Sequence, residues 1–284
     1  MFIWSRLQDL ILRPILFICL AWGLLGGQIA DGASPCLRLL EQEGIGEELV
    51  NRFCRELTVS PAIIGKNLKQ VEYQAVYDRF LEPATVGKGR LFLKENRAWL
   101  SGIEALYQVE GELITAIFLV ESDLGRYQGS YSLLEVFFSL ASCAEEQHLR
   151  VVYAELKKSY PELEYQWLQR RAQKKALWGY EQLVALFKLS DRIEVDQVKG
   201  SWAGAFGICQ FIPSSCLNYA VDGNGDGRID LYDFKDAAAS VAHYLKKNGW
   251  RPGLDRQARE DVVWSYNHSK LYCRTVVELA YRLQ

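Results

Sequence analysis

The stretch ITAIFLVESDLG, residues 114–125, is apolar on every side for seven residues, apart from Thr115, and then presents Glu121. A helix that is apolar all round is typical of a protein core rather than of a surface. Gly125 predicts the end of this helix, because glycine is common just past a helix C-terminus. The stretch therefore predicts a central buried helix with one carboxyl group at its last turn.

Loss of water around that carboxyl group would raise its pKa, which suits a general acid that works near neutral pH. The alternative is a structural carboxylate that emerges into solvent as the helix ends, and this stretch alone leaves both open. Glu121 is therefore the candidate catalytic residue.

The composition sets broad limits on the kind of protein. The chain has 284 residues, enough for one or two domains with a sizeable core. Its formal net charge of −2 predicts no broad basic face and hence no nucleic-acid partner. The 8 Trp, 15 Tyr and 12 Phe residues suit both a protein core and a carbohydrate-binding groove.

The first 33 residues have the layout of a secretory signal peptide. Arg6 and Arg13 precede the apolar run 15–26, and small residues suited to cleavage follow within 30–33. An uncleaved N-terminal anchor is the alternative, because the uncharged run 14–30 is at the short limit for a membrane-spanning helix. In either case we expect an exported protein of the periplasm or cell envelope.

Six cysteines follow residue 33, and an even number in an exported chain is compatible with disulfides. Cys36 and Cys54 bracket one short segment and are the predicted pair. No C-x-x-C occurs and the three His residues are scattered, so no zinc site is predicted.

Apolar residues recur at helical spacing along most of the chain, and no run shows convincing strand alternation, so we expect a mainly α fold. We expect a helical region at 34–110, a main domain at 111–284 and a helical insertion within it at about 142–198. The many charges of the insertion indicate a solvated lobe. Helices are expected at residues 37–49, 71–81, 92–109, 132–141, 145–158, 165–189, 214–221, 235–248 and 270–283, with a turn at 85–89.

Residues 200–215, GSWAGAFGICQFIPSS, differ from the helical stretches around them. Their three glycines weaken any helix and allow the backbone to approach a ligand closely. Gln210 places a polar amide among apolar neighbours, and Phe211 follows it. A ligand-lining loop and a tight packing loop are equally good interpretations.

Residues 222–233, DGNGDGRIDLYD, match the twelve-residue EF-hand calcium loop. Oxygen donors stand at its positions 1, 3 and 5, glycine at position 6 and isoleucine at position 8. Position 12 is Asp233, where glutamate is usual, so binding there is expected to involve fewer ligands or to be weaker. Only one such loop is present, which favours a calcium ion with a structural role over a switch.

These pieces, in this order, resemble the family 3 lytic transglycosylases of the membrane-bound lytic transglycosylase B type. The resemblance runs from about Tyr73 to the end of the chain. It is carried by Val120-Glu121-Ser122 with Gly125-Arg126, by residues 200–215, 222–233 and 236–250, and by Tyr266-Asn267.

The resemblance implies a lysozyme-like catalytic domain at 111–284. It implies cleavage of the β-1,4 bond between N-acetylmuramic acid and N-acetylglucosamine in peptidoglycan, without water, to leave a 1,6-anhydro ring. Glu121 would act first as acid and then as base. The groove lining would comprise Ser201, Gln210, Phe211, Tyr244, Tyr266 and Asn267. The calcium ligands would be Asp222, Asn224, Asp226, the carbonyl of Arg228, and Asp233.

The expected partners are peptidoglycan glycan strands and cell-wall synthesis or remodelling proteins, and we expect a monomer. The sequence departs from the family where a Tyr-Pro-Arg-Arg segment often follows the stretch matching 132–141. Here residues 142–148 read SCAEEQH, so we expect the family's basic contacts to the substrate's peptide or carboxylate to be absent. Cys209 also stands where the family motif usually has glycine, and a disulfide or added bulk at this position would narrow the groove.

Three alternatives stay open. A hydrolytic muramidase would need a second carboxylate near Glu121, and Asp123 is a poor candidate because residues two apart on a helix do not share a face. A catalytically weak peptidoglycan-binding protein is the second alternative, suggested by the altered segment after Ala141. A calcium-regulated binding module is the third.

Overall fold

The computed structural model describes residues 44–54, 57–69 and 75–284, which belong to one compact unit covering 35–284. The prediction of a mainly α fold is confirmed. The helices of the first half are α3 (Glu47–Cys54), α4 (Pro61–Leu68), α5 (Ala75–Asp78), the 3-10 turn η1 (Arg79–Leu81), α6 (Pro83–Tyr107), α7 (Gly111–Ser122) and α8 (Leu133–Ala141). Those that follow are α9 (Glu146–Ser159), α10 (Tyr165–Lys188), α11 (Pro213–Tyr219), α12 (Phe234–Lys247), α13 (Arg256–Tyr266) and α14 (Lys270–Leu283).

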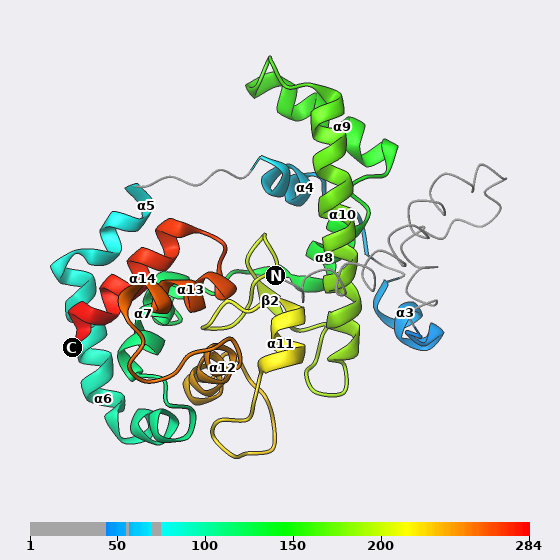
Figure 1. Cartoon of the computed structure of the whole chain (residues 1–284). Coiled ribbons are helices and arrows are strands. Elements are labelled where there is room, and N and C mark those ends of the chain that lie inside the picture. Colours follow the sequence, from blue (N-terminus) through cyan, green and yellow to red (C-terminus); the bar gives the residue numbers. More distant parts are fainter. Residues whose placement is uncertain (1–43, 55–56, 70–74) are drawn as a thin grey trace, which may run out of the picture. The chain divides into compact units, whose positions relative to one another are not determined.

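Helix α7 is the centre of the core, as its apolar sequence predicts. Every residue from Leu113 to Leu119 is at most 1% exposed. The helix packs between α6 and α14 (Figure 1). Complete burial of each Leu, Ile or Phe side chain contributes about 1.5–3 kcal/mol. The helix ends in three left-handed residues, Asp123, Leu124 and Gly125, so the predicted stop lies within this turn.

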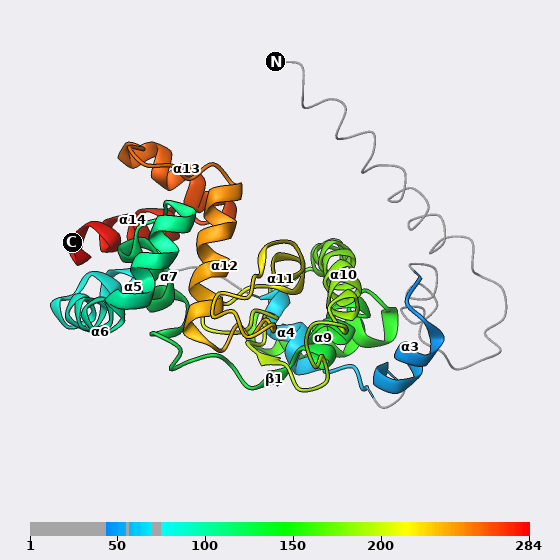
Figure 2. The ribbon, with the colours of Figure 1, turned by 90° about the horizontal axis from the view of Figure 1, so that it is seen from below.

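The interpretation of 142–198 as a solvated lobe is wrong for α10. The second half of this helix packs on α8 so closely that a Cβ atom on Gly179 would lie 2.6 Å from the Cβ of Leu140. Its first half forms a smaller apolar cluster with α4 and α9, which includes Leu168, Ala172 and Leu149 (Figure 2). Charges at the remaining positions concealed this buried stripe, because a long helix can be charged on one side and buried on the other.

The predicted turn at 85–89 is also wrong, because α6 begins at Pro83 and runs through it. Gly89 lies inside this helix and faces the core. An added Cβ there would lie 2.5 Å from a methyl carbon of Leu283 and 2.9 Å from one of Leu119. The glycine therefore permits close packing of α6 on α7 and α14 rather than a change of chain direction.

Two short strands, β1 (Tyr131–Ser132) and β2 (Lys199–Gly200), pair antiparallel with Tyr131 opposite Gly200. They fasten the start of the 200–215 loop to the segment after α7. Within the described part of the chain, no helix combines the length and the apolar character needed to cross a membrane. The predicted signal peptide and Cys36 of the predicted Cys36–Cys54 disulfide lie outside the described residues.

Candidate active site

Glu121 stands at the last turn of α7 and is half-buried. Burial raises the pKa of its carboxyl group from 4.5 to about 7, and the hydroxyl of Tyr272 lowers that pKa by a weak hydrogen-bonding interaction. The Tyr272 side chain is 2% exposed, and its hydroxyl has no hydrogen bond of ordinary geometry within the described chain. The carboxyl group is therefore poised to hold a proton near neutral pH.

The other groups that interact electrostatically with Glu121 are the neutral side chains of Tyr266 and Cys209. The Tyr266 hydroxyl donates a hydrogen bond of 2.5 Å to the backbone oxygen of Cys209. Its ring stacks on that of Tyr272 with 6.3 Å between centroids. The Cys209 thiol is free and fully buried, so its sulfur packs in the core beside the site, and its effect on the width of the groove stays a prediction.

Asp123 does not serve as a second carboxylate for Glu121. It lies beyond the helix in a left-handed conformation, and its carboxylate pairs with Lys88 at 2.9 Å and with Arg126 at 3.8 Å. In the part of the chain that the structure describes, no carboxylate is among the groups that shift the pKa of Glu121. The arrangement thus provides one titratable acid rather than a pair.

The 200–215 loop both packs tightly and lines a cavity. A Cβ atom on Gly204 would lie 2.1 Å from the ring of Phe137, so the backbone touches α8 directly. Gln210 has a left-handed backbone with φ of 50°, and its Nε2 donates to the backbone oxygen of Gly207 at 2.9 Å. This conformation turns the loop so that Gln210 and Phe211 reach the cavity wall.

A cavity of about 300 Å³ brings together four of the six predicted groove residues, Gln210, Phe211, Tyr244 and Tyr266. Phe211 and Tyr244 are mostly buried, and their rings pack with 5.7 Å between centroids. These two side chains therefore pack behind the cavity wall and expose little surface to a ligand. The remaining lining residues are Trp178, Ile212, Ser215, Ser265 and His268.

Sequence reasoning missed Trp178 and His268. Trp178 lies on α10, which was interpreted as a solvated helix, and only the packing of α10 on α8 brings it to the cavity. An aromatic residue at helical spacing is ordinary in a core, so its sequence position carried no signal.

Ser201 and Asn267 do not line this cavity. The Ser201 hydroxyl accepts the backbone N–H of Ala205 at 3.1 Å and thereby holds the first turn of the loop. The backbone oxygen of Asn267 accepts the N–H of Ser269 at 2.8 Å between α13 and α14. Both residues remain predictions as substrate contacts.

The predicted calcium loop is closed by hydrogen bonds from its own backbone. Asp222 accepts the N–H groups of Gly225, Asp226 and Gly227, which lowers its pKa. Asn224 and Asp226 likewise accept from residues two further along. Asp233 caps the N-terminus of α12 by accepting from Lys235 and Asp236.

Sequence reasoning missed Asp236 in this loop. Its side chain is 0% exposed, and its two oxygens accept the N–H groups of Gly223, Asn224 and Asp230. The oxygen donors of the loop suit a hard cation in their chemistry. Among the described residues, however, no three His, Cys, Asp or Glu side chains meet at a point that could hold a metal ion.

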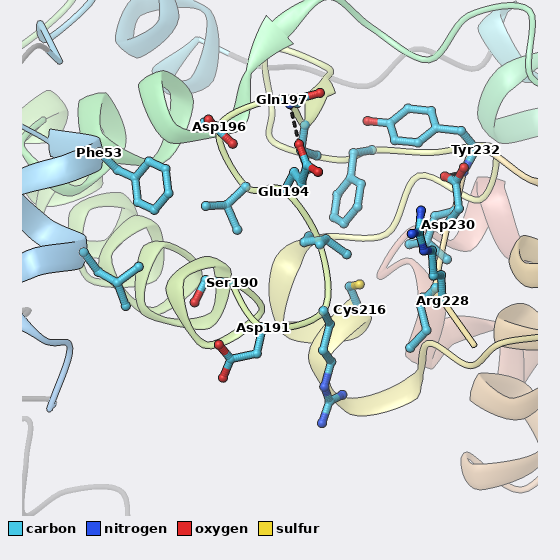
Figure 3. Close-up of a pocket in the computed structure, with 18 of the residues that line it drawn as sticks. Phe53, Ser190, Asp191, Glu194, Asp196, Gln197, Cys216, Arg228, Asp230 and Tyr232 are labelled. Atoms are coloured by element: carbon cyan, nitrogen blue, oxygen red, sulfur yellow. Dashed lines mark hydrogen bonds between the residues drawn. The ribbon is translucent and has the colours of Figure 1, made fainter. Parts of the chain in front are cut away.

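A second cavity, of about 1370 Å³, lies beside this loop (Figure 3). Phe53 of α3 and Asp191 line one side, and Arg228, Asp230 and Tyr232 line the other. Its wall mixes both signs of charge with apolar side chains. Glu121 lines neither cavity, and none of the predicted groove residues lines this one. The cavity beside Tyr266 holds four of the groove residues, and Tyr266 interacts with Glu121, so that cavity is the candidate active site.

Residues 32–259 match the family model described as the transglycosylase SLT domain. The chain belongs to this family. It is also 35% identical over 183 residues to the membrane-bound lytic murein transglycosylase B of Escherichia coli strain K12. That match covers 62% of this chain and 41% of the relative, so the chain spans about two fifths of the length of that SLT-domain protein.

Solved structures share the fold. Soluble lytic transglycosylase SltB1 of Pseudomonas aeruginosa superposes with a TM-score of 0.71 at 21% identity, over 88% of this chain and 98% of that one. SltB3 of the same organism, in complex with NAG-anhNAM-pentapeptide, gives 0.68 at 20%, over 87% and 77%. Escherichia coli Slt35, in complex with calcium, gives 0.68 at 22%, over 91% and 95%. The architecture of this SLT-domain chain is therefore that of the lytic transglycosylases.

Proposed function

We propose that this protein is a peptidoglycan lytic transglycosylase with Glu121 as its single acid and base. The observation that carries the proposal is one carboxyl group with a pKa of about 7, whose electrostatic partners among the described residues are neutral and include no second carboxylate. An ordinary glycosidase divides its work between two carboxylates. A reaction in which the substrate supplies its own nucleophile needs only one.

In the first step Glu121 donates its proton to the oxygen of the β-1,4 bond. The bond from that oxygen to C1 of N-acetylmuramic acid breaks, and N-acetylglucosamine leaves with a 4-hydroxyl group. The Glu121 carboxylate then takes the proton of the 6-hydroxyl group, whose oxygen attacks C1 and closes the 1,6-anhydro ring. Glu121 ends protonated, as it began. Because its pKa of about 7 is close to neutral pH, one residue can serve as acid in the first step and as base in the second.

The cavity lined by Tyr266, a side chain that interacts with Glu121, suits a sugar chain. Its lining combines aromatic rings, among them Trp178 and Tyr266, with the polar groups of Gln210 and Ser215. Aromatic faces pack on the apolar faces of sugars, while amide and hydroxyl groups bond to sugar hydroxyls. The SltB3 complex with NAG-anhNAM-pentapeptide supports the same ligand class for this chain.

The calcium ion is a further part of the proposal. The donors would be Asp222, Asn224, Asp226 and the carbonyl of Arg228, and the calcium complex of Slt35 supports this choice of metal. Asp236, whose buried carboxylate already holds both ends of the loop, replaces Asp233 as the acidic group that closes it. The role of the ion would be to neutralise these carboxylates and stabilise the loop.

The relative's description as membrane-bound supports a place in the cell envelope, in line with the predicted signal or anchor at residues 1–33. Glycan strands are the proposed partner. Contact with other cell-wall proteins and the monomeric state stay predictions.

Mass spectrometry of soluble products tests the proposed reaction. Purified protein and its Glu121→Gln variant are incubated with peptidoglycan sacculi. The wild type is expected to release muropeptides one water lighter than hydrolysed ones, and the variant is expected to release none. Hydrated products would instead show a muramidase. Binding to sacculi without any products would show a binding protein.

A further inference from the structure

Ser122, the residue after Glu121, joins the end of α7 to the 200–215 loop. Its side chain is 1% exposed. The Oγ atom lies 2.7 Å from the backbone oxygen of Ile208 and 2.9 Å from the backbone nitrogen of Gly125. The Oγ atom also lies 3.3 Å from the backbone oxygen of Phe118, one turn back in α7. A hydroxyl group can donate one hydrogen bond and accept others, so it donates to Ile208, the nearer acceptor, and accepts from Gly125.

The partner segment, residues 207–210, is itself held in place and is called the strap below. The N–H of Ile208 donates to the backbone oxygen of Leu231 at 2.8 Å, in the predicted calcium loop. The next backbone oxygen, that of Cys209, accepts the Tyr266 hydroxyl. The Gln210 amide folds back onto Gly207. The strap is therefore held by hydrogen bonds other than the one from Ser122.

Through its hydrogen bond to Ile208, the Ser122 side chain links the last turn of α7 to the strap. Backbone hydrogen bonds from Asp123 to Leu119 and from Leu124 to Phe118 close this turn on itself, and the Ser122 bond joins it to the strap. The Glu121 carboxyl interacts electrostatically with the side chain of Cys209, which follows Ile208 in the strap, and with that of Tyr266, whose hydroxyl binds the strap. The position of the carboxyl group thus depends on the distance between the helix end and the strap.

We propose that Ser122 is a positioning residue, whose hydroxyl holds Glu121 against the strap and thereby keeps the carboxyl group in its desolvated place. The proposal rests on the proposed function for its kinetic consequence. A Ser122→Ala substitution leaves the Ile208 oxygen and the Gly125 N–H without this partner in a buried place. The last turn then loosens and water reaches Glu121.

The test compares Ser122→Ala with Ser122→Thr, which keeps the hydroxyl, and with Ser139→Ala. Ser139 is a matched control, because its buried Oγ accepts the backbone N–H of Ser60 at 2.9 Å in another part of the molecule. Folding of each variant is checked by circular dichroism and melting temperature. Initial rates on sacculi are measured from pH 5 to pH 9.

Ser122→Ala is expected to lower kcat about tenfold to a hundredfold with little change in KM, since small misplacements of a reacting group have this effect. The pH at which the rate falls is expected to move below 7. Ser122→Thr is expected to restore both values, and Ser139→Ala is expected to lower the melting temperature alone. Equal pH profiles in all variants, or a Thr variant as poor as the Ala variant, would overturn the proposal.

A second measurement does not depend on activity. The side-chain carboxyl carbon of Glu121 is followed by NMR during a pH titration of the wild type and of Ser122→Ala. A lower titration midpoint in the variant is expected from renewed contact with water. If the wild type cuts no peptidoglycan but the midpoint still falls, the proposed function fails and the positioning role stands. If the wild type is active and the midpoint is unchanged, the positioning role fails.

Discussion

The Tyr272 hydroxyl of α14 faces the Glu121 carboxyl of α7 without a hydrogen bond of ordinary geometry to any described residue. Its weak interaction opposes the effect of burial on the carboxyl group, because a hydroxyl dipole favours the ionised form. Tyr272 is thus the group in the site that makes Glu121 easier to ionise.

Tyr272→Phe is expected to raise the pKa of Glu121 above its present value of about 7. The first step needs a protonated Glu121, so activity should fall at a higher pH in the variant than in the wild type. The pH profile of kcat/KM on sacculi measures this. A fall that moves to lower pH would show that Tyr272 does not stabilise the carboxylate.

Glu121→Gln is expected to make the protein more stable at high pH while it abolishes cleavage. The folded-state pKa of about 7 exceeds the ordinary value of 4.5, so between these values the folded state binds a proton that the unfolded state releases. The wild type therefore loses stability as pH rises through this window, by about 1–3 kcal/mol once the accessible part of the side chain is considered. The Glu121→Gln variant does not lose this stability, because the glutamine side chain does not ionise.

Thermal melts at pH 5 and pH 8 check this expectation. The difference in melting temperature between Glu121→Gln and the wild type should grow by several degrees at pH 8. An equal difference at both pH values would contradict a raised pKa for Glu121.

Gly89→Ala and Gly87→Ala form a matched pair within α6. A Cβ at Gly89 meets methyl groups of Leu119 and Leu283, so overpacking should lower the free energy of unfolding by about 1–3 kcal/mol. A Cβ at Gly87 meets nothing within 4 Å, and alanine there should stabilise the helix by about 0.5–1 kcal/mol. Urea unfolding measures both. Equal effects would show that α6 does not pack on α7 and α14 at Gly89.

Asp236→Ala is expected to destabilise the protein more than Asp233→Ala. Asp236 is buried and accepts three backbone N–H groups, whereas Asp233 is a helix cap, whose loss costs about 0.5–2 kcal/mol. If calcium binds, chelator should lower the melting temperature of the wild type but not that of Asp226→Ala. A wild-type melt unaffected by chelator would contradict the calcium proposal.

The sequence by itself determined the features that depend on local chemistry. The apolar run around Ile117 determined a buried helix, because no other arrangement removes so many apolar side chains from water. Glu121 at its last turn, the turn at Gly125 and the extents of α9, α12 and α14 followed from spacing and helix-ending residues. Four of the six predicted groove residues meet in one cavity, although their substrate role stays a prediction.

The tertiary structure decided every feature that depends on what packs against what. It placed Tyr272 beside Glu121, brought Trp178 to the cavity and turned Gly89 into a contact point between helices. It also determined that Asp236 accepts the hydrogen bonds that close the loop and that Asp233 caps helix α12. The physical reason is that burial, desolvation and close approach are set by residues far apart along the chain, and residue spacing carries no information about such neighbours.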